Sequence, residues 1–144
     1  MTSIVKTITK FIGSIILLFG LYLILHGHLQ PGGGFEGGIA LGTSFILITL
    51  AYGKEVMFDK INQLTGIILQ SLGVIIFLTV AFLGYYGGFF LRNYFPKGIP
   101  FGYLSGGDIP LISFGIGLAT AFAIWGAFIA LTSFRIIKDP RQKS

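Results

Sequence analysis

The chain has 144 residues, of which 53% are apolar and only 10% are charged, and its mean hydropathy is +0.86. Soluble domains carry about 25% charged residues, so this composition excludes an ordinary soluble protein and indicates an integral membrane protein. The formal net charge of +5 does not indicate nucleic-acid binding, because the basic residues cluster at the chain ends and in one loop, where anionic lipid headgroups are the expected neighbours.

Four apolar stretches are long enough to cross a bilayer as helices, which takes about 20 residues each. They cover about residues 8–25, 35–52, 64–89 and 109–134. We expect the third stretch, which is longer than a bilayer requires, to fray near Gly87 and Gly88. The fourth has a defined start, because Asp108 can cap it and Pro110 is tolerated in a first turn. The sequence therefore predicts an all-α membrane protein with a single domain of four transmembrane helices.

The basic residues predict the orientation of these helices. Four spans place the N-terminus, the middle loop and the C-terminus on the same side of the membrane. That side carries eight basic residues, which are Lys6, Lys10, Lys54, Lys60, Arg135, Lys138, Arg141 and Lys143. The opposite side carries only Arg92 and Lys97. Because basic residues accumulate on the cytoplasmic side of membrane proteins, both termini are predicted to be cytoplasmic.

The connection between the first two spans is the first candidate for a functional site. Residues 26–42 read HGHLQPGGGFEGGIALG, so polar and glycine-rich sequence stands between two apolar runs. Such a segment is costly beside a bilayer unless protein or a water-filled cavity surrounds it. Pro31 prevents the first helix from continuing, and the glycine triplet 32–34 permits unusual backbone conformations. We expect Phe35 to anchor this turn in an apolar pocket.

Three polar side chains near this turn are candidates for an ion or proton path, namely His28, Glu36 and Thr43. His28 either supplies a titratable group or hydrogen-bonds backbone carbonyls. Glu36 falls in the first turn of the second span, where a carboxylate either interacts with the helix dipole or marks a cation or proton site. Thr43 follows seven residues later, nearly in line with Glu36 on a helix. No metal site is predicted, because the pair His26 and His28 has only one carboxylate nearby.

Small residues recur every four positions in two of the spans, which allows another helix to approach closely. In the second span the row is Gly34, Gly38 and Gly42. In the fourth span one row is Gly115, Ala119, Ala123 and Ala127, and a second is Ser113, Gly117 and Ala121. The partners of these rows are either helices of the same chain or helices of other subunits. Other subunits are the favoured interpretation, because four helices have few buried faces.

The sequence shows no arrangement typical of an enzyme. It contains no cysteine, no nucleophile beside a general base and no phosphate-binding loop. We therefore predict no catalytic residue and no cofactor. The loop 92–107 is rich in aromatic residues, proline and glycine, which is typical of an interfacial cap, a contact with another subunit, or an aromatic belt at the headgroups.

The segment His28-Leu-Gln-Pro31-Gly-Gly-Gly34-Phe35-x-Gly-Gly38 resembles the signature of the MrpB (also MnhB) family. These are small membrane subunits of multisubunit Na+/H+ antiporters. The chain is also similar to them in length, in its four spans and in its short basic C-terminus. Similar subunits occur in membrane-bound hydrogenases and sulfane sulfur reductases, where an Mrp-like module accompanies a redox module. Glu36 departs from the apolar residue that other members often have at its position.

The resemblance implies a non-catalytic subunit of a sodium/proton translocating complex in the cell membrane. Its partners would be other membrane subunits of an Mrp-like module, with hydrogenase or sulfane reductase subunits in a redox-coupled assembly. Na+ and H+ would be the transported ions of the complex, and the lipid bilayer would surround it. Two other hypotheses remain open from the residues alone. One is an independent small ion carrier or channel, and the other is a purely structural spacer.

Overall fold

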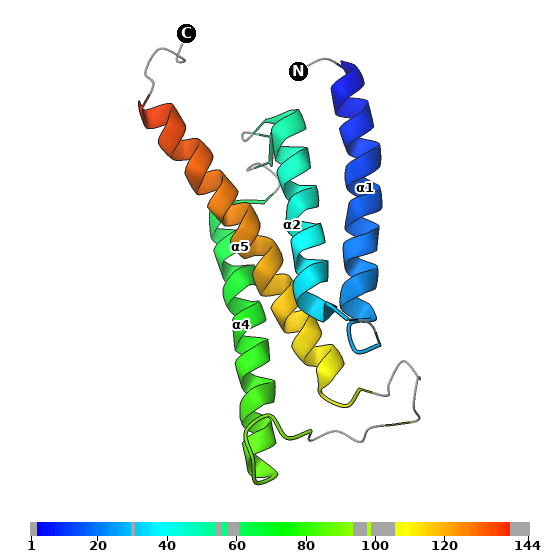
Figure 1. The fold of residues 1–144 in the computed structure, drawn as a ribbon. Coiled ribbons are helices and arrows are strands. Elements are labelled where there is room, and N and C mark those ends of the chain that lie inside the picture. The colour runs from blue at the N-terminus through cyan, green and yellow to red at the C-terminus, as the bar shows by residue number, and fades with distance from the viewer. Residues whose placement is uncertain are drawn as a thin grey trace.

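The computed structural model describes residues 3–29, 31–53, 56–57, 61–93, 98 and 106–138, with side chains up to residue 133. Its long helices are α1 (Ser3–Leu25), α2 (Gly33–Tyr52), α4 (Gln63–Tyr86) and α5 (Ile109–Lys138) (Figure 1). All four are long and apolar enough to cross a membrane, which for α5 applies to Ile109–Ser133. The prediction of an all-helical chain with four potential spans is therefore confirmed.

The helix ends follow from local chemistry. Helix α1 begins at Ser3 instead of about residue 8, because Lys6 and Lys10 are good helix formers whose ammonium groups can reach a membrane surface. Helix α4 ends at Tyr86, directly before the two glycines where fraying is expected, and Gly88 has a φ of +107°. Helix α5 begins at Ile109, as predicted from the residues around it.

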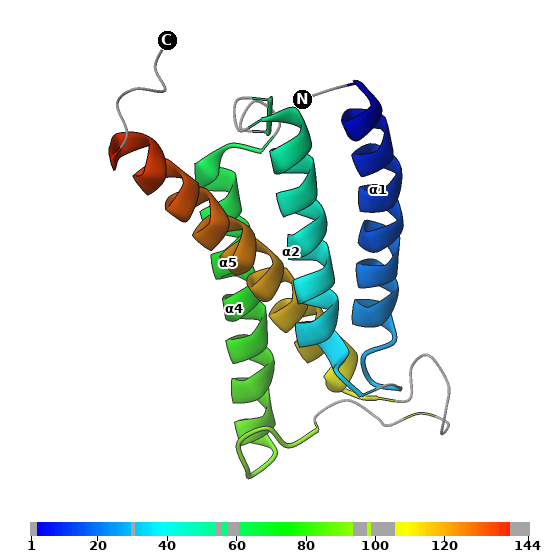
Figure 2. The ribbon, with the colours of Figure 1, turned by 45° about the horizontal axis from the view of Figure 1, so that its top comes forward.

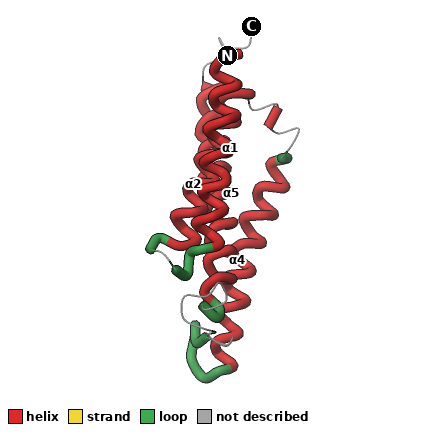
Figure 3. The backbone as a smooth tube through the Cα atoms, turned by 90° about the vertical axis from the view of Figure 1, so that its right-hand side faces the viewer, coloured by secondary structure: helices red, strands yellow, loops and turns green. Residues whose placement is uncertain are grey.

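The helices form an open row instead of a closed four-helix bundle. Helix α1 packs along α2, α2 along α5, and α5 along α4, whereas α4 barely touches α1 and α2. The same order is visible from two directions (Figures 1 and 2), and Figure 3 shows α4 on the side of the row away from α1 and α2. The start of α1 and the end of α5 lie at one end, called here the terminal end; the α1–α2 turn lies at the opposite, turn-side end (Figure 1).

Large apolar side chains remain exposed on every helix because the row encloses little volume. Phe11 is 69% exposed, Leu18 66% and Ile68 64%. The main buried cluster lies toward the terminal end and consists of Met57, Phe122, Trp125 and Ile129. An apolar surface of this extent faces lipid or another subunit in a membrane protein.

The glycine row of α2 packs against the second small-residue row of α5. A Cβ built on Gly38 would lie 2.7 Å from the carbonyl oxygen of Gly117, and one built on Gly42 would lie 2.9 Å from that of Ala121. A Cβ on Gly34 would collide with the backbone of Ser113. The favoured interpretation, in which these two rows meet other subunits, is therefore wrong, because the two rows pack against each other within the same chain.

The other small-residue row of α5, Gly115, Ala119, Ala123 and Ala127, has different neighbours in its two halves. Its first part packs against α4, since a Cβ built on Gly73 would lie 2.6 Å from both the backbone nitrogen of Ala119 and the carbonyl oxygen of Gly115. Ala123 and Ala127 lie nearer the terminal end, where they line a groove of about 250 Å³ between α4 and α5. Only this second part of the row remains available to a partner.

A third close-packed interface, between α1 and α2, has no counterpart among the predicted rows. A Cβ built on Gly37 would lie 2.9 Å from the carbonyl oxygen of Gly20. Two turns further along α2, Ser44 is completely buried, and its hydroxyl donates a 2.8 Å hydrogen bond to the carbonyl oxygen of Gly13. The signal in the sequence is a spacing of seven, which separates Gly13 from Gly20 and Gly37 from Ser44.

Candidate functional site

The turn that joins α1 to α2 begins with a hydrogen-bonded histidine. The backbone N–H of His26 donates to the carbonyl oxygen of Tyr22 at 3.0 Å, and its side-chain Nδ1 lies 3.1 Å from the same oxygen. Because a carbonyl oxygen only accepts, Nδ1 carries the proton in this contact. The imidazole also stacks on the Tyr22 ring, with 4.3 Å between centroids. His26 thus caps the C-terminal end of α1 by binding the carbonyl oxygen of Tyr22.

The glycine triplet meets two different requirements. Gly32 and Gly33 have φ values of +100° and +54°, in the left-handed region where a side chain is strained. Gly34 has an ordinary helical position but lies directly against the backbone of Ser113 on α5. The first two glycines therefore reverse the chain, and the third allows α2 to approach α5.

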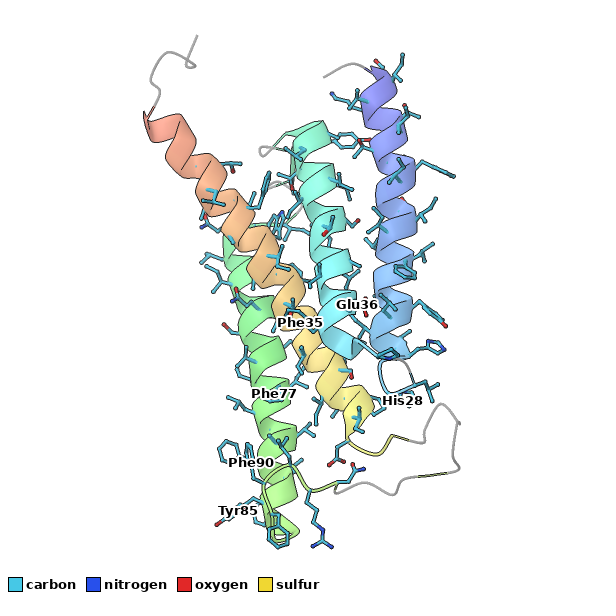
Figure 4. The ribbon with its side chains drawn as sticks, viewed as in Figure 1. His28, Phe35, Glu36, Phe77, Tyr85 and Phe90 are labelled. Atoms are coloured by element: carbon cyan, nitrogen blue, oxygen red, sulfur yellow. The ribbon has the colours of Figure 1, made fainter. Side chains whose placement is uncertain are left out.

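Two further motif residues lie on the outside of the turn. Pro31 is exposed. The expectation that Phe35 anchors the turn in an apolar pocket is wrong, because its side chain is 59% exposed (Figure 4). The reason is the rotation of α2: Gly34 must face α5, which turns the next position about 100° away from that interface.

His28 lies on the inner side of the turn, beside the start of α5 (Figure 4). A Cβ built on Gly106 would lie 3.0 Å from the Cβ of His28 and 2.9 Å from Pro110 Cδ, so the histidine packs tightly there. The residue is half-buried, and its Nδ1 atom is fully buried. His28 is thus part of the contact between the α1–α2 turn and α5.

Asn93 and Asp108 join His28 at this end of the molecule. The backbone N–H of Asp108 donates a 2.7 Å hydrogen bond to Asn93 Oδ1, and the aspartate is only 4% exposed. Gly107, with a φ of +58°, leaves room for the Asn93 amide. We call His28, Asn93 and Asp108 the turn-side cluster. The sequence did not point to Asn93, because the residue follows α4 and reaches Asp108 only through the fold.

Glu36 and Thr43 lie on a face of α2 that is separate from the turn-side cluster. Both are exposed on the side of α2 that neither α1 nor α5 covers. The Glu36 carboxyl group folds back against Gly32 at the start of the helix, where a negative charge interacts favourably with the helix dipole. The hydroxyl of Thr43 donates a 2.8 Å hydrogen bond to the carbonyl oxygen of Ile39. The predicted alignment of Glu36 with Thr43 is therefore present, whereas His28 belongs to the turn-side cluster.

The polar side chains near the turn do not form a group of ligands around one ion position. In the described part of the chain, no three side chains of His, Cys, Asp or Glu come together as metal ligands would. Glu36 offers oxygen atoms on an exposed face, and the turn-side cluster offers the buried Asp108 beside the half-buried His28 and Asn93. Any cation or proton relay through Glu36 therefore requires further groups beside this exposed face.

The chain is similar to a known family over most of its length. Residues 4–126 match the family described as a domain related to the MnhB subunit of Na+/H+ antiporter. An uncharacterized protein of Methanocaldococcus jannaschii is 28% identical over 99% of this chain and 57% of its own length. A putative antiporter subunit, mnhB2, of Staphylococcus aureus (strain Newman) is 35% identical over 51% of this chain and 56% of its own. The chain spans about half the length of these curated relatives.

A solved structure shows the same fold. One chain in the structure of the membrane-bound sulfane sulfur reductase, an archaeal respiratory membrane complex, aligns with a TM-score of 0.70 and 27% identity. The alignment covers 88% of this chain and 56% of that one. The family match covers α1, α2, α4 and most of α5, including the turn with its glycine triplet. The chain therefore belongs to the MnhB family, whose domain is related to a subunit of Na+/H+ antiporters.

Proposed function

We propose that the chain is a non-catalytic membrane subunit of a multisubunit Na+/H+ antiporter module and takes part in sodium/proton translocation. The observation that carries this proposal is the family match over residues 4–126. The Staphylococcus aureus relative, named a putative antiporter subunit, supports it. The absence of a nucleophile–base pair or phosphate loop in the sequence agrees with a role in transport instead of catalysis.

The module exists in one of two settings. It is either a stand-alone Mrp-type antiporter or the membrane part of a redox-driven pump. The likeness to a chain of a respiratory membrane complex, at 27% identity and a TM-score of 0.70, supports the redox setting. The relative from Staphylococcus aureus, which is named a putative antiporter subunit, supports an antiporter module in either setting.

The open row of helices supports a place among other membrane subunits. Its exposed apolar side chains lie on all four helices, and Ala123 and Ala127 offer small residues to a neighbouring helix. We place the complex in the cell membrane, with both termini of this chain in the cytoplasm. Under this proposal the exposed face of α2 with Glu36 and Thr43 lies against another subunit, because an acidic residue is costly against lipid.

Purification from the native membrane tests the proposal. The full chain, carrying a C-terminal affinity tag, is extracted in mild detergent and analysed on native gels and by mass spectrometry. We expect it to co-purify with other multi-pass membrane proteins in a complex whose reconstituted vesicles exchange Na+ for H+. Redox subunits in the same complex would identify the redox setting. A functional homo-oligomer of this chain alone would contradict the proposal and favour an independent carrier.

A further inference from the structure

A groove at the terminal end separates α1 from α2 and has no part in the turn described above. It has a volume of about 370 Å³ and is lined by Lys10, Ser14, Ile48, Tyr52, Val56 and Met57. Ligand sites in proteins commonly have volumes of about 300–1,000 Å³. The groove is therefore large enough for a small headgroup and the first part of an attached chain.

Lys10 lines the groove, and a second lysine, Lys6, lies beside it near Tyr52. Lys6 and Lys10 stand one turn apart on α1 and so share a face of the helix. The ammonium nitrogen of Lys6 lies 5.9 Å from the centroid of the Tyr52 ring, a cation–π distance. Within the described part of the chain neither lysine forms an ion pair, and α1 contains no acidic residue. The two carboxylates among the described residues, Glu36 and Asp108, lie at the turn-side end, so neither of them offsets this positive charge.

The rest of the lining combines polar and apolar groups. Tyr52 supplies a phenol, whereas Ile48, Val56 and Met57 supply apolar surface. The Ser14 hydroxyl already donates a 2.7 Å hydrogen bond to the carbonyl oxygen of Lys10, so it can only accept another. Cationic and apolar groups in one groove match the two parts of a phospholipid, whose anionic phosphate is attached to acyl chains.

We propose that this groove binds an anionic phospholipid. The ammonium groups of Lys6 and Lys10 and the phenol of Tyr52 bind its phosphate, and the first part of an acyl chain lies on Ile48 and Val56. Basic pockets between membrane helices bind anionic lipid headgroups in this way. A water-soluble phosphate compound suits the groove less, because half of its lining would stay without a matching group. The inference depends neither on the proposed transport function nor on the orientation of the chain.

Lipid titration in native mass spectrometry tests this inference. The full chain, with any subunits that co-purify, is titrated in non-ionic detergent with dioleoyl phosphatidylglycerol, dioleoyl phosphatidylcholine or inorganic phosphate. Each basic side chain near an anionic surface contributes about fivefold to binding, so two lysines predict roughly a 25-fold preference for phosphatidylglycerol over phosphatidylcholine. Equal binding of the two lipids, or saturation by inorganic phosphate alone, would overturn the proposal.

Matched variants locate the binding. Lys6→Gln with Lys10→Gln should remove the preference, whereas Lys6→Arg with Lys10→Arg should keep it. Arg141→Gln with Lys143→Gln removes the same charge from the C-terminal end and should also keep it. Val56→Trp fills the groove from its exposed rim without changing charge and should lower phosphatidylglycerol binding, with helix content checked by circular dichroism. The proposal fails if the double glutamine variant at residues 6 and 10 retains the preference.

Discussion

The three glycines of the α1–α2 turn, residues 32–34, have two different structural roles. The sequence indicated that the glycine triplet reverses the chain, and the positive φ values of Gly32 and Gly33 agree with this. It also placed Gly34 in a row of small residues that allows another helix to approach, and in the structure that helix is α5, at the backbone of Ser113. Which helix approaches Gly34 could not be predicted, because Ser113 lies far along the chain.

Gly34→Ala tests this role. A methyl group there would collide with Ser113, so we expect a loss of stability of about 1–3 kcal/mol, the usual cost of overpacking. The control is Gly126→Ala on α5, where a Cβ meets nothing within 4 Å. Removing a helical glycine is favourable by up to about 1 kcal/mol, so this control should be neutral or stabilising. Thermal unfolding in detergent measures both, and equal midpoints would contradict the packing argument.

Glu36→Gln tests whether the exposed face of α2 takes part in transport. The substitution removes a titratable charge with little change in shape, and the side chain is exposed within this chain. We expect severalfold lower Na+-dependent activity per assembled complex, with the amount of complex unchanged. Glu36→Asp keeps the carboxylate and should retain more activity. Full activity of the glutamine variant across pH would support the purely structural spacer instead.

His28→Ala should behave differently from Glu36→Gln. The histidine packs against Gly106 in the contact between the turn and α5, so its removal leaves a gap there. We expect a lower unfolding temperature of the chain and less assembled complex, together with any loss of activity. Normalising activity to assembled complex separates these effects. An unchanged unfolding temperature would show that the turn-side cluster does not stabilise the fold.

At the level of helices, α2 has small residues on two faces. Gly34, Gly38 and Gly42 face α5, while Gly37 and Ser44 face α1. The four-residue spacing predicted the first face, but the second was missed because its members are seven apart and include a serine. Periodicity shows that a face is smooth, whereas only the packing of the helices shows which neighbour covers it.

Gly38→Leu should disturb the α2–α5 contact. A Cβ on Gly38 would already lie 2.8 Å from the Cβ of Thr120, and leucine adds three more carbon atoms. We expect the variant to unfold at a clearly lower temperature and to assemble poorly. Ile39→Leu changes a neighbouring side chain that is 38% exposed and should be nearly neutral. Equal assembly of the two variants on native gels would exclude close α2–α5 packing.

The whole molecule is an open row whose two ends differ in charge. The start of α1 and the end of α5 lie at the terminal end, as an even number of membrane crossings requires (Figure 1). Lys6 and Lys10 also belong to that end, whereas Arg92 follows α4 at the other. This asymmetry supports cytoplasmic termini through the positive-inside bias.

Cysteine labelling tests the orientation. The chain contains no cysteine, so each introduced one is a unique target. We expect Ser3→Cys and Ser144→Cys to react with a membrane-impermeant maleimide only after the cytoplasmic side is opened. Lys97→Cys should react in intact cells. The reverse pattern would place the termini outside and contradict the charge argument.

The sequence by itself determined the class of protein, its four potential spans and its resemblance to the MnhB family. Those properties depend on the hydropathy of segments of about 20 residues and on one local motif, so they need no knowledge of distant contacts. Only the tertiary structure decided that the small-residue rows pair within the chain, that Phe35 points outward and that His28 packs against Gly106 before α5. These depend on how each helix is rotated about its axis and on which distant segments meet, which the local pattern of residues does not specify.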